Sequence, residues 1–166
     1  KLGRWIDLAR ASGITHFEIS HFFTQWGAKH APKVMANIGG ALLRLFGWGT
    51  DAAGEEYAAF LRAFIPQLLD YLKAKGVDKN CHFHISDEPS AQQLEGYLAA
   101  KAVVADMLKG YPIMDALSDY AFYESGAVEH PIPANNHIAP FLEHNVPDLW
   151  TYYCCGQNMG VSNRFM

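Results

Sequence analysis

The sequence predicts an α/β fold arranged as part of a (β/α)8 barrel of the TIM type. Segments with strand character alternate with helical segments, and the connections are long enough to cross over, which favours parallel strands. Two strands also have one polar side, whereas a doubly wound sheet is covered by helices on both faces and favours apolar residues on both. We therefore expect about four strand-helix units, roughly half of a barrel, in one domain over residues 1–166 without an internal boundary.

The first helix and the first strand occupy residues 1–20. Apolar residues recur at helical spacing from Trp5 to Ala9, and Gly13 provides a stop. In the strand that follows, residues 15–20, Phe17 and Ile19 share one side, and His16, Glu18 and Ser20 share the other.

Residues 21–50 form a long connection rich in Gly, Phe and Trp, and long loops in compact domains are usually functional. Within it, residues 40–45 are predicted as a short helix. Asp51 is the predicted N-cap of the next helix, whose apolar face runs from Tyr57 to Leu72. Pro66 either kinks this helix or divides it in two.

The strand at residues 81–89, CHFHISDEP, has the clearest pattern in the chain. Phe83 and Ile85 are predicted to pack under helices, whereas His82, His84 and Glu88 point towards the barrel centre with Glu18 of the first strand. Asp87 and Glu88 follow at the strand exit, where Pro89 ends the strand.

The remaining elements follow from caps and periodicity. Ser90 is the predicted cap of a helix that closes at Gly110. We expect a strand over 113–120, a loop over 126–136, a short helix over 138–144 and a fourth strand over 149–155.

Composition excludes several classes of protein. The chain is 50% hydrophobic with a net charge of -4 and has no basic stripe, so nucleic acid is not an expected partner. Its apolar runs are too short for a membrane span. Three cysteines, Cys81, Cys154 and Cys155, lack the spacing of a disulfide or zinc scaffold and favour reduced thiols in the cytoplasm. The chain begins inside a helical pattern, so we expect a fragment whose lost N-terminus leaves secretion open.

Five motifs resemble the catalytic domain of glycoside hydrolase family 123 and related bacterial domains once of unknown function. They span the chain in order: HFFTQWGA at 21–28, HISDEP at 84–89, DALSDY at 115–120, LWTYYCCG at 149–156 and SNRFM at 162–166. The resemblance implies a (β/α)8 barrel that acts as a retaining exo-β-N-acetylgalactosaminidase, without a cofactor, on a 2-acetamido-2-deoxy-β-galactoside or similar carbohydrate.

The resemblance also implies unequal roles for the adjacent carboxylates: Glu88 is the general acid/base, and Asp87 orients the 2-acetamido group, which is the nucleophile. Candidate substrate-binding residues are Trp26, His84, Asp119, Tyr120, Trp150, Tyr152, Asn163 and Arg164. Half a barrel cannot enclose a pocket, so we expect the isolated chain to be inactive.

Other interpretations stay open. Asp87 and Glu88 are also compatible with a polar turn between strand and helix, and His82 and His84 with a hydrogen-bonded interior network; a metal site lacks a third ligand at fixed spacing. Two alternatives to substrate assistance are a two-carboxylate retaining glycosidase whose nucleophile lies outside the chain and a carbohydrate-binding barrel without turnover.

Overall fold

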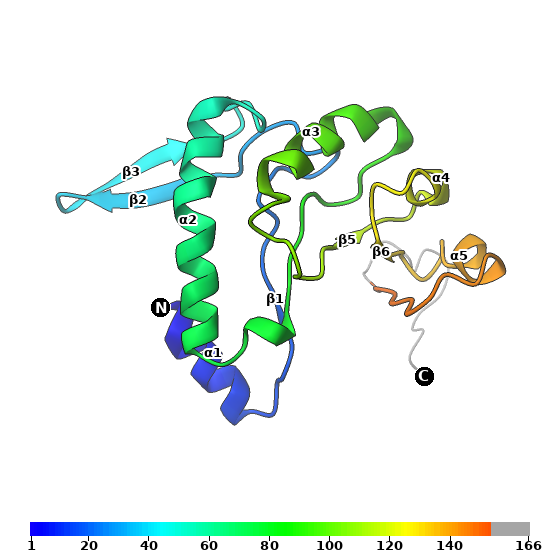
Figure 1. Cartoon of the computed structure of the whole chain (residues 1–166), viewed down its shortest axis with the longest axis horizontal. Coiled ribbons are helices and arrows are strands. Elements are labelled where there is room, and N and C mark those ends of the chain that lie inside the picture. The colour runs from blue at the N-terminus through cyan, green and yellow to red at the C-terminus, as the bar shows by residue number, and fades with distance from the viewer. Residues whose placement is uncertain (154–166) are drawn as a thin grey trace, which may run out of the picture.

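The computed structural model describes residues 1–153, in which helices alternate with short strands (Figure 1). The predicted α/β class is therefore confirmed. The sheets in this range are three two-stranded pairs, β1 with β4, β2 with β3 and β5 with β6, and none closes on itself. The partial TIM-type barrel is not confirmed at this level and stays a prediction.

Parallel pairing, predicted from the alternation of elements, is found in the two pairs that build the centre of the molecule. β1 (Phe17–Glu18) pairs with β4 (Cys81–His82), and β5 (Met114–Ala116) pairs with β6 (His130–Ile132). Isolated parallel bridges, Phe83 to Ile113 and Ala134 to Tyr152, connect these pairs to each other and to the C-terminal segment. The chain thus lays successive strands side by side with their carboxyl ends at one edge.

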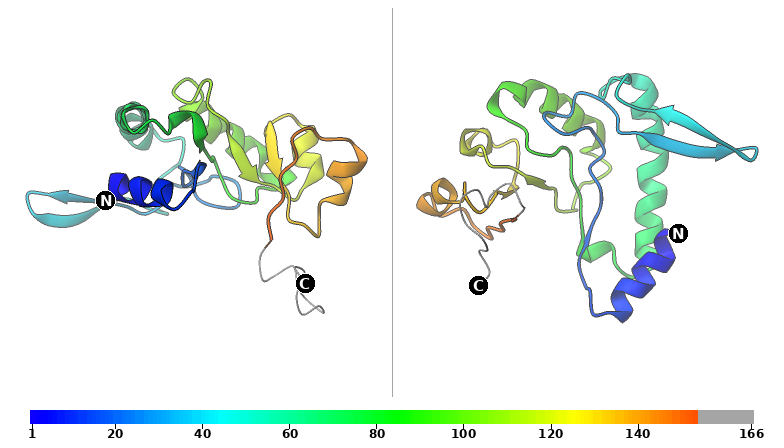
Figure 2. Two further views of the ribbon diagram at one scale, coloured as in Figure 1. Left: turned by 90° about the horizontal axis from the view of Figure 1, so that it is seen from below. Right: turned by 180° about the vertical axis from the view of Figure 1, so that it is seen from behind.

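Helices α1 (Leu2–Ala11) and α2 (Glu55–Ala74) lie next to each other, as the views in Figures 1 and 2 show. α2 is one continuous helix that contains Pro66, so the predicted division is wrong. Its N-cap is Gly54, not Asp51, because the Asp51 carboxylate accepts a hydrogen bond from Ala53 N in the preceding turn. Within the described range no helix is both long enough and apolar enough to cross a membrane.

Residues 34–46 form a hairpin, so the short helix predicted over 40–45 is wrong. β2 (Val34–Ile38) pairs antiparallel with β3 (Ala41–Phe46). The turn residues Gly39 and Gly40 both have positive φ, 58° and 90°, which a two-residue hairpin turn requires and glycine adopts without strain. Figures 1 and 2 show the hairpin projecting away from the rest of the molecule.

The helix predicted after Ser90 is present. Ser90 and Gln93 form a capping box at a short 3-10 turn (Ala91–Gln93), from which α3 (Leu94–Val104) continues. The helix ends before the predicted stop at Gly110. Gly110 does have a positive φ of 86° and lies in the turn that leads to β5.

The C-terminal third differs most from the prediction. The predicted strand over 113–120 is limited to β5, and α4 (Tyr120–Glu124) begins directly after Asp119. The predicted loop over 126–136 contains β6, whereas α5 (Ala139–Glu143) agrees with the predicted short helix. Of the predicted strand over 149–155, Tyr152 forms one bridge, and Cys154 and Cys155 lie outside the described residues.

The core lies between the central strands and α2 and α3. Phe83 and Ile85 are completely buried, and Phe17 is 2% exposed, in one cluster with Leu61 and Tyr97. The apolar parity of these strands therefore packs under helices as predicted. The other parity borders a pocket.

Candidate active site

A pocket of about 400 Å³ opens along the polar side of the central strands. One wall is formed by polar residues of β1, β4 and their extensions: Glu18, His21, His82, His84, Ser86 and Asp87. The other wall comes from β5, β6 and the C-terminal segment: Met114, Ala116, Ile132, Trp150, Thr151 and Tyr152. Glu18, His82 and His84 thus share one side, as their sequence parity predicts.

β4 (Cys81–His82) is much shorter than the strand predicted over 81–89, and the irregular segment that follows it places Asp87 and Glu88 at the pocket. Asp87 is partly buried and lines it, whereas Glu88 is exposed and has a positive φ of 45°. Glu88 N donates to Ala116 O at 2.9 Å, and Trp26 N donates to Asp87 O at 2.8 Å. Hydrogen bonds on both sides therefore hold the turn that presents the two carboxylates.

Tyr152 connects the C-terminal segment to this exit, because its hydroxyl donates a hydrogen bond to Glu88 Oε1. Glu88 and Tyr152 are 64 residues apart in the chain. The contact orients the carboxyl group of Glu88 beside an aromatic wall of the pocket.

Asp87 has a pKa raised above its ordinary value of 3.8. Burial is the main cause, and the negative charge of Glu88 adds to it, while His21 and His84 act in the opposite direction. The pocket therefore penalises a negative charge at Asp87.

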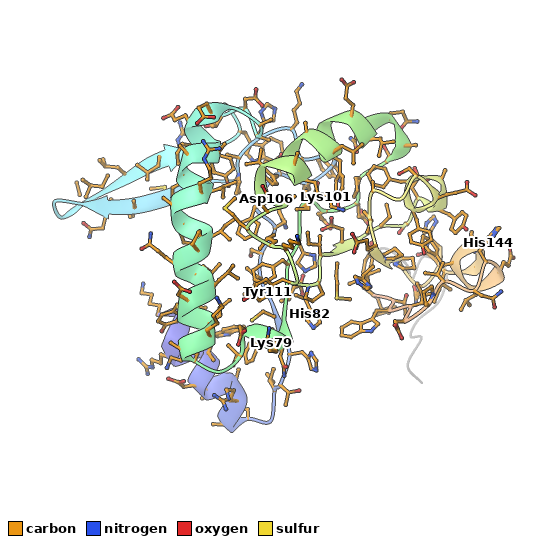
Figure 3. All side chains as sticks on the ribbon, in the orientation of Figure 1. Lys79, His82, Lys101, Asp106, Tyr111 and His144 are labelled. Atoms are coloured by element: carbon orange, nitrogen blue, oxygen red, sulfur yellow. The ribbon has the colours of Figure 1, made fainter. Side chains whose placement is uncertain are left out.

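His82, labelled in Figure 3, contacts two other aromatic side chains at the pocket. Its ring stacks on that of His16 at 5.3 Å and lies 5.4 Å from the ring of Trp150. Burial and, next, the neighbouring imidazoles His16 and His84 lower the pKa of His82, so its neutral form is favoured.

His84 is 8% exposed and stands between two carboxylates. Its Nδ1 lies 3.6 Å from Asp115 Oδ1, and its Nε2 lies 3.1 Å from Glu18 Oε1. The second contact has ion-pair distance but not hydrogen-bond alignment, and Nε2 has no hydrogen-bond partner in the described range. His84 thus links the buried Asp115 to Glu18 in the pocket wall.

The structure brings together four of the predicted site residues, His84, Asp87, Trp150 and Tyr152, at one pocket, and Glu88 joins them through Tyr152. Asn163 and Arg164 lie outside the described residues.

Three predicted sugar contacts lie elsewhere. Trp26 is 57% exposed in a separate surface hollow beside Gln92 and Gln93. Asp119 is the N-cap of α4, where it accepts from Phe122 N, and Tyr120 stacks on His144. Helix capping and ring packing are common structural roles for polar and aromatic residues near strand ends, and they do not require a ligand.

Sequence reasoning did not select Glu18, His21 or His82 as site residues, although all three line the pocket. The strand parity already pointed Glu18 and His82 towards the same side as His84. His21 had no comparable signal, because it follows the strand in an irregular segment.

Metal and thiol chemistry find little support among residues 1–153. No group of three or more His, Cys, Asp or Glu side chains in this range is arranged to hold a metal ion. Burial raises the pKa of the Cys81 thiol to about 11, which disfavours the reactive thiolate.

A second hollow of about 610 Å³ lies on the other side of β1, where Trp5, Phe60, Phe64 and other mainly apolar side chains line it. Glu18 and His21 line both hollows, but His82, His84 and Asp87 line the first and not the second.

A pocket with paired carboxylates and aromatic rings at the carboxyl ends of parallel strands is the site arrangement of α/β enzymes. The chain matches the model of the glycoside hydrolase 123 catalytic domain over residues 1–166 and belongs to this family. No significant match was found among curated protein sequences.

The structure is similar to that of a family 123 glycoside hydrolase from Clostridium perfringens, which was analysed for the details of glycolipid glycan hydrolysis. The two chains share 13% sequence identity with a TM-score of 0.61, which supports a common fold. The match covers 93% of this chain and 29% of the clostridial chain, so this chain spans less than a third of that protein.

Proposed function

We propose that the protein carrying this chain is a glycosidase that removes terminal β-linked N-acetylgalactosamine, or a closely related 2-acetamido sugar, with retention of configuration. The observation that carries the proposal is the pair Asp87 and Glu88 at the mouth of an aromatic-lined pocket, in a chain of glycoside hydrolase family 123. We further propose that the parallel segments around β1, β4, β5 and β6 are part of a (β/α)8 barrel.

The adjacency of the two carboxylates favours assistance by the substrate. A retaining glycosidase with a protein nucleophile places its two carboxyl groups about 5 Å apart on opposite sides of the sugar. Asp87 and Glu88 are adjacent in the segment that follows β4, so they approach the sugar from one side. The 2-acetamido carbonyl oxygen then serves as the nucleophile.

In the first step the acetamido oxygen attacks the anomeric carbon while Glu88 donates its proton to the departing glycosidic oxygen. The product is a cyclic oxazolinium-like intermediate, and Asp87 orients the acetamide and stabilises the positive charge on its nitrogen. In the second step Glu88 removes a proton from water, whose oxygen attacks the anomeric carbon and restores the acetamide. The Tyr152 hydroxyl holds Glu88 in place for both proton transfers.

Turnover of an aryl 2-acetamido-2-deoxy-β-galactoside by the protein that carries this chain tests the role of Glu88. Glu88→Gln is expected to lower kcat by about 100- to 10,000-fold, as removal of a general acid/base typically does. The matched control is Glu143→Gln, an exposed glutamate on α5, which should leave kcat unchanged. Equal turnover by the wild type and Glu88→Gln would refute the assignment.

Substrate assistance is tested with a second glycoside that has a hydroxyl group in place of the acetamide. The wild type should hydrolyse it far more slowly. Comparable rates, or a covalent sugar trapped on a carboxylate, would instead establish a protein nucleophile.

A further inference from the structure

The surface hollow that contains Trp26 is not used by the proposed reaction. It has a volume of about 500 Å³ and lies between residues 26–29 and the start of α3. Trp26 is its aromatic residue, and more than half of this residue is exposed. A large aromatic side chain left in water at the edge of a hollow is a candidate ligand contact.

The backbone fixes the position of the Trp26 ring. Trp26 has a positive φ of 59°, which is strained for a bulky residue and persists only where the surroundings impose it. Gly27 N and Ala28 N both donate hydrogen bonds to Ser86 Oγ, which holds the turn on the central strands. A Cβ atom at Gly27 would lie 2.6 Å from Gln93 Cβ, so the turn also packs closely against the 3-10 turn before α3.

Polar groups beside the ring are available for a ligand. The side-chain oxygens of Gln92 and Gln93 accept hydrogen bonds from Ser90, one from its Oγ and the other from its backbone N. Neither amide nitrogen donates a hydrogen bond to another group among residues 1–153. Lys29 and Glu95 are the charged lining residues, and their charges are opposite. An apolar ring with hydrogen-bond donors and no net charge suits a neutral ligand that is rich in hydroxyl groups.

The hollow is connected to the proposed reaction centre through one short segment, residues 87–93. Asp87 O accepts the hydrogen bond from Trp26 N at 2.8 Å, and Gln92 and Gln93 follow Glu88 in the same segment. In the proposed reaction Glu88 protonates the glycosidic oxygen, so the leaving group departs on the side of this segment. The hollow is therefore placed to contact the leaving group.

We propose that the Trp26 hollow binds the leaving-group part of the glycan, with a neutral hexose stacked on the indole and its hydroxyl oxygens bound by the amide nitrogens of Gln92 and Gln93. A hexose with equatorial hydroxyls has a flat C–H face that packs on an aromatic ring, and its edge carries the hydrogen-bonding groups. Recognition thus extends from the sugar that is released to the chain that carries it. The side on which the leaving group lies rests on the proposed function.

Two glycosides with alcohol leaving groups of similar reactivity separate the hollow from the pocket. Both contain 2-acetamido-2-deoxy-β-galactose. One carries a methyl group, and the other carries cellobiose, whose glucose units have flat apolar faces. In the protein that carries this chain, kcat/KM should favour the trisaccharide over the methyl glycoside about tenfold, and Trp26→Ala should remove this preference. A wild type without the preference, or a preference that survives in Trp26→Ala, would overturn the proposal.

Milder variants distinguish ligand binding from a general effect on the turn. Trp26→Phe keeps an aromatic ring and should retain most of the preference, whereas Gln92→Ala should reduce it about threefold through the loss of one hydrogen bond. The matched control is Trp48→Ala, because Trp48 is exposed in the same connection but does not line the hollow. A loss of preference in Trp48→Ala as large as that in Trp26→Ala would overturn the assignment to the hollow.

Binding of cellobiose alone separates this inference from the proposed function. Cellobiose should shift the indole N–H resonance of Trp26, which is assigned by its absence from Trp26→Phe, and should leave that of Trp48 in place. If the wild type hydrolyses neither glycoside, the proposed function fails and the shift still tests the hollow. If both glycosides are hydrolysed equally well and cellobiose causes no shift, the hollow assignment fails and the proposed function stands.

Discussion

The two sides of the segment from Cys81 to Ser86, which begins as β4, are both largely buried, yet they are stabilised differently. On the helix side, the side chains of Phe83 and Ile85 are stabilised by apolar packing alone. On the pocket side, Ser86 Oγ accepts from Gly27 N and Ala28 N and donates to Thr24 O. His84 Nε2, by contrast, lacks a hydrogen-bond partner in the described range.

This difference separates residues that make the fold from residues that are available for chemistry. Buried polar atoms are nearly always paired, and the hydrogen bonds of Ser86 follow that rule, whereas His84 Nε2 has only the Glu18 carboxylate at 3.1 Å. Substitutions on the helix side should therefore change mainly stability. Substitutions on the pocket side should change mainly activity.

The largest expected effect is on the helix side. Phe83→Ala should lower the free energy of unfolding by about 3–5 kcal/mol, because it leaves a cavity at a site with no exposure. Urea denaturation of the protein that carries this chain measures the change. A loss below about 1 kcal/mol would mean that this face does not form the core that the burial indicates.

Asp87→Asn, at the pocket end of the same segment, should lower kcat about 100-fold, as loss of one charge-stabilising group in an active site does. The same substitution should increase the stability of the folded protein. The pKa of Asp87 is raised in the folded state, so the ionised carboxylate destabilises the fold at pH above that pKa.

Denaturation curves at several pH values check this sign. The Asn variant should be more stable than the wild type near neutral pH, and the gain should vanish as pH falls below the ordinary Asp pKa of 3.8. A variant that is less stable than the wild type at neutral pH would contradict the unfavourable environment of Asp87.

Tyr152→Phe sharpens the comparison because it removes one hydroxyl from the pocket side and no packing volume. Loss of the hydrogen bond to Glu88 should lower kcat/KM about tenfold, as for a hydrogen bond to a charged group. The midpoint of thermal unfolding should change little. A large loss of stability with normal kinetics would assign Tyr152 to the fold.

Strand parity was the part of this architecture that the sequence could reveal. Side chains alternate across a strand, so the pattern from His82 to Ser86 was enough to predict which residues pack under helices and which line the pocket. The caps at Ser90 and Gly13 were equally local signals.

The errors concern features that local patterns do not determine. The run from Ala41 to Phe46 consists of residues that suit either a helix or a strand, and the Gly39–Gly40 turn decides for the hairpin. The contact of Tyr97 with Asp115 joins two elements and has no local signal. Asp119 is the N-cap of α4, a role that suits a carboxylate before a helix, and its contact with a sugar stays a prediction.

The smallest expected effect tests whether burial, and not residue type, determines the cost of a substitution. Leu42 on the hairpin is apolar like Phe83 but 69% exposed. Leu42→Ser should change the free energy of unfolding by no more than about 0.5 kcal/mol. A much larger loss would show that the hairpin is covered by another surface in solution.

The left-handed backbone conformation of Glu88 lowers the stability of the fold at a residue that the proposed activity requires. A non-glycine residue at φ 45° is strained by about 1 kcal/mol or more, and glycine would relieve that strain. Glu88→Gly would therefore be favoured in a selection for heat resistance alone, although it removes the proposed acid/base. Variants of this protein that are selected for use at high temperature should be assayed for turnover in every round. A substitution at position 88 could raise the melting temperature of the protein and abolish its activity at the same time.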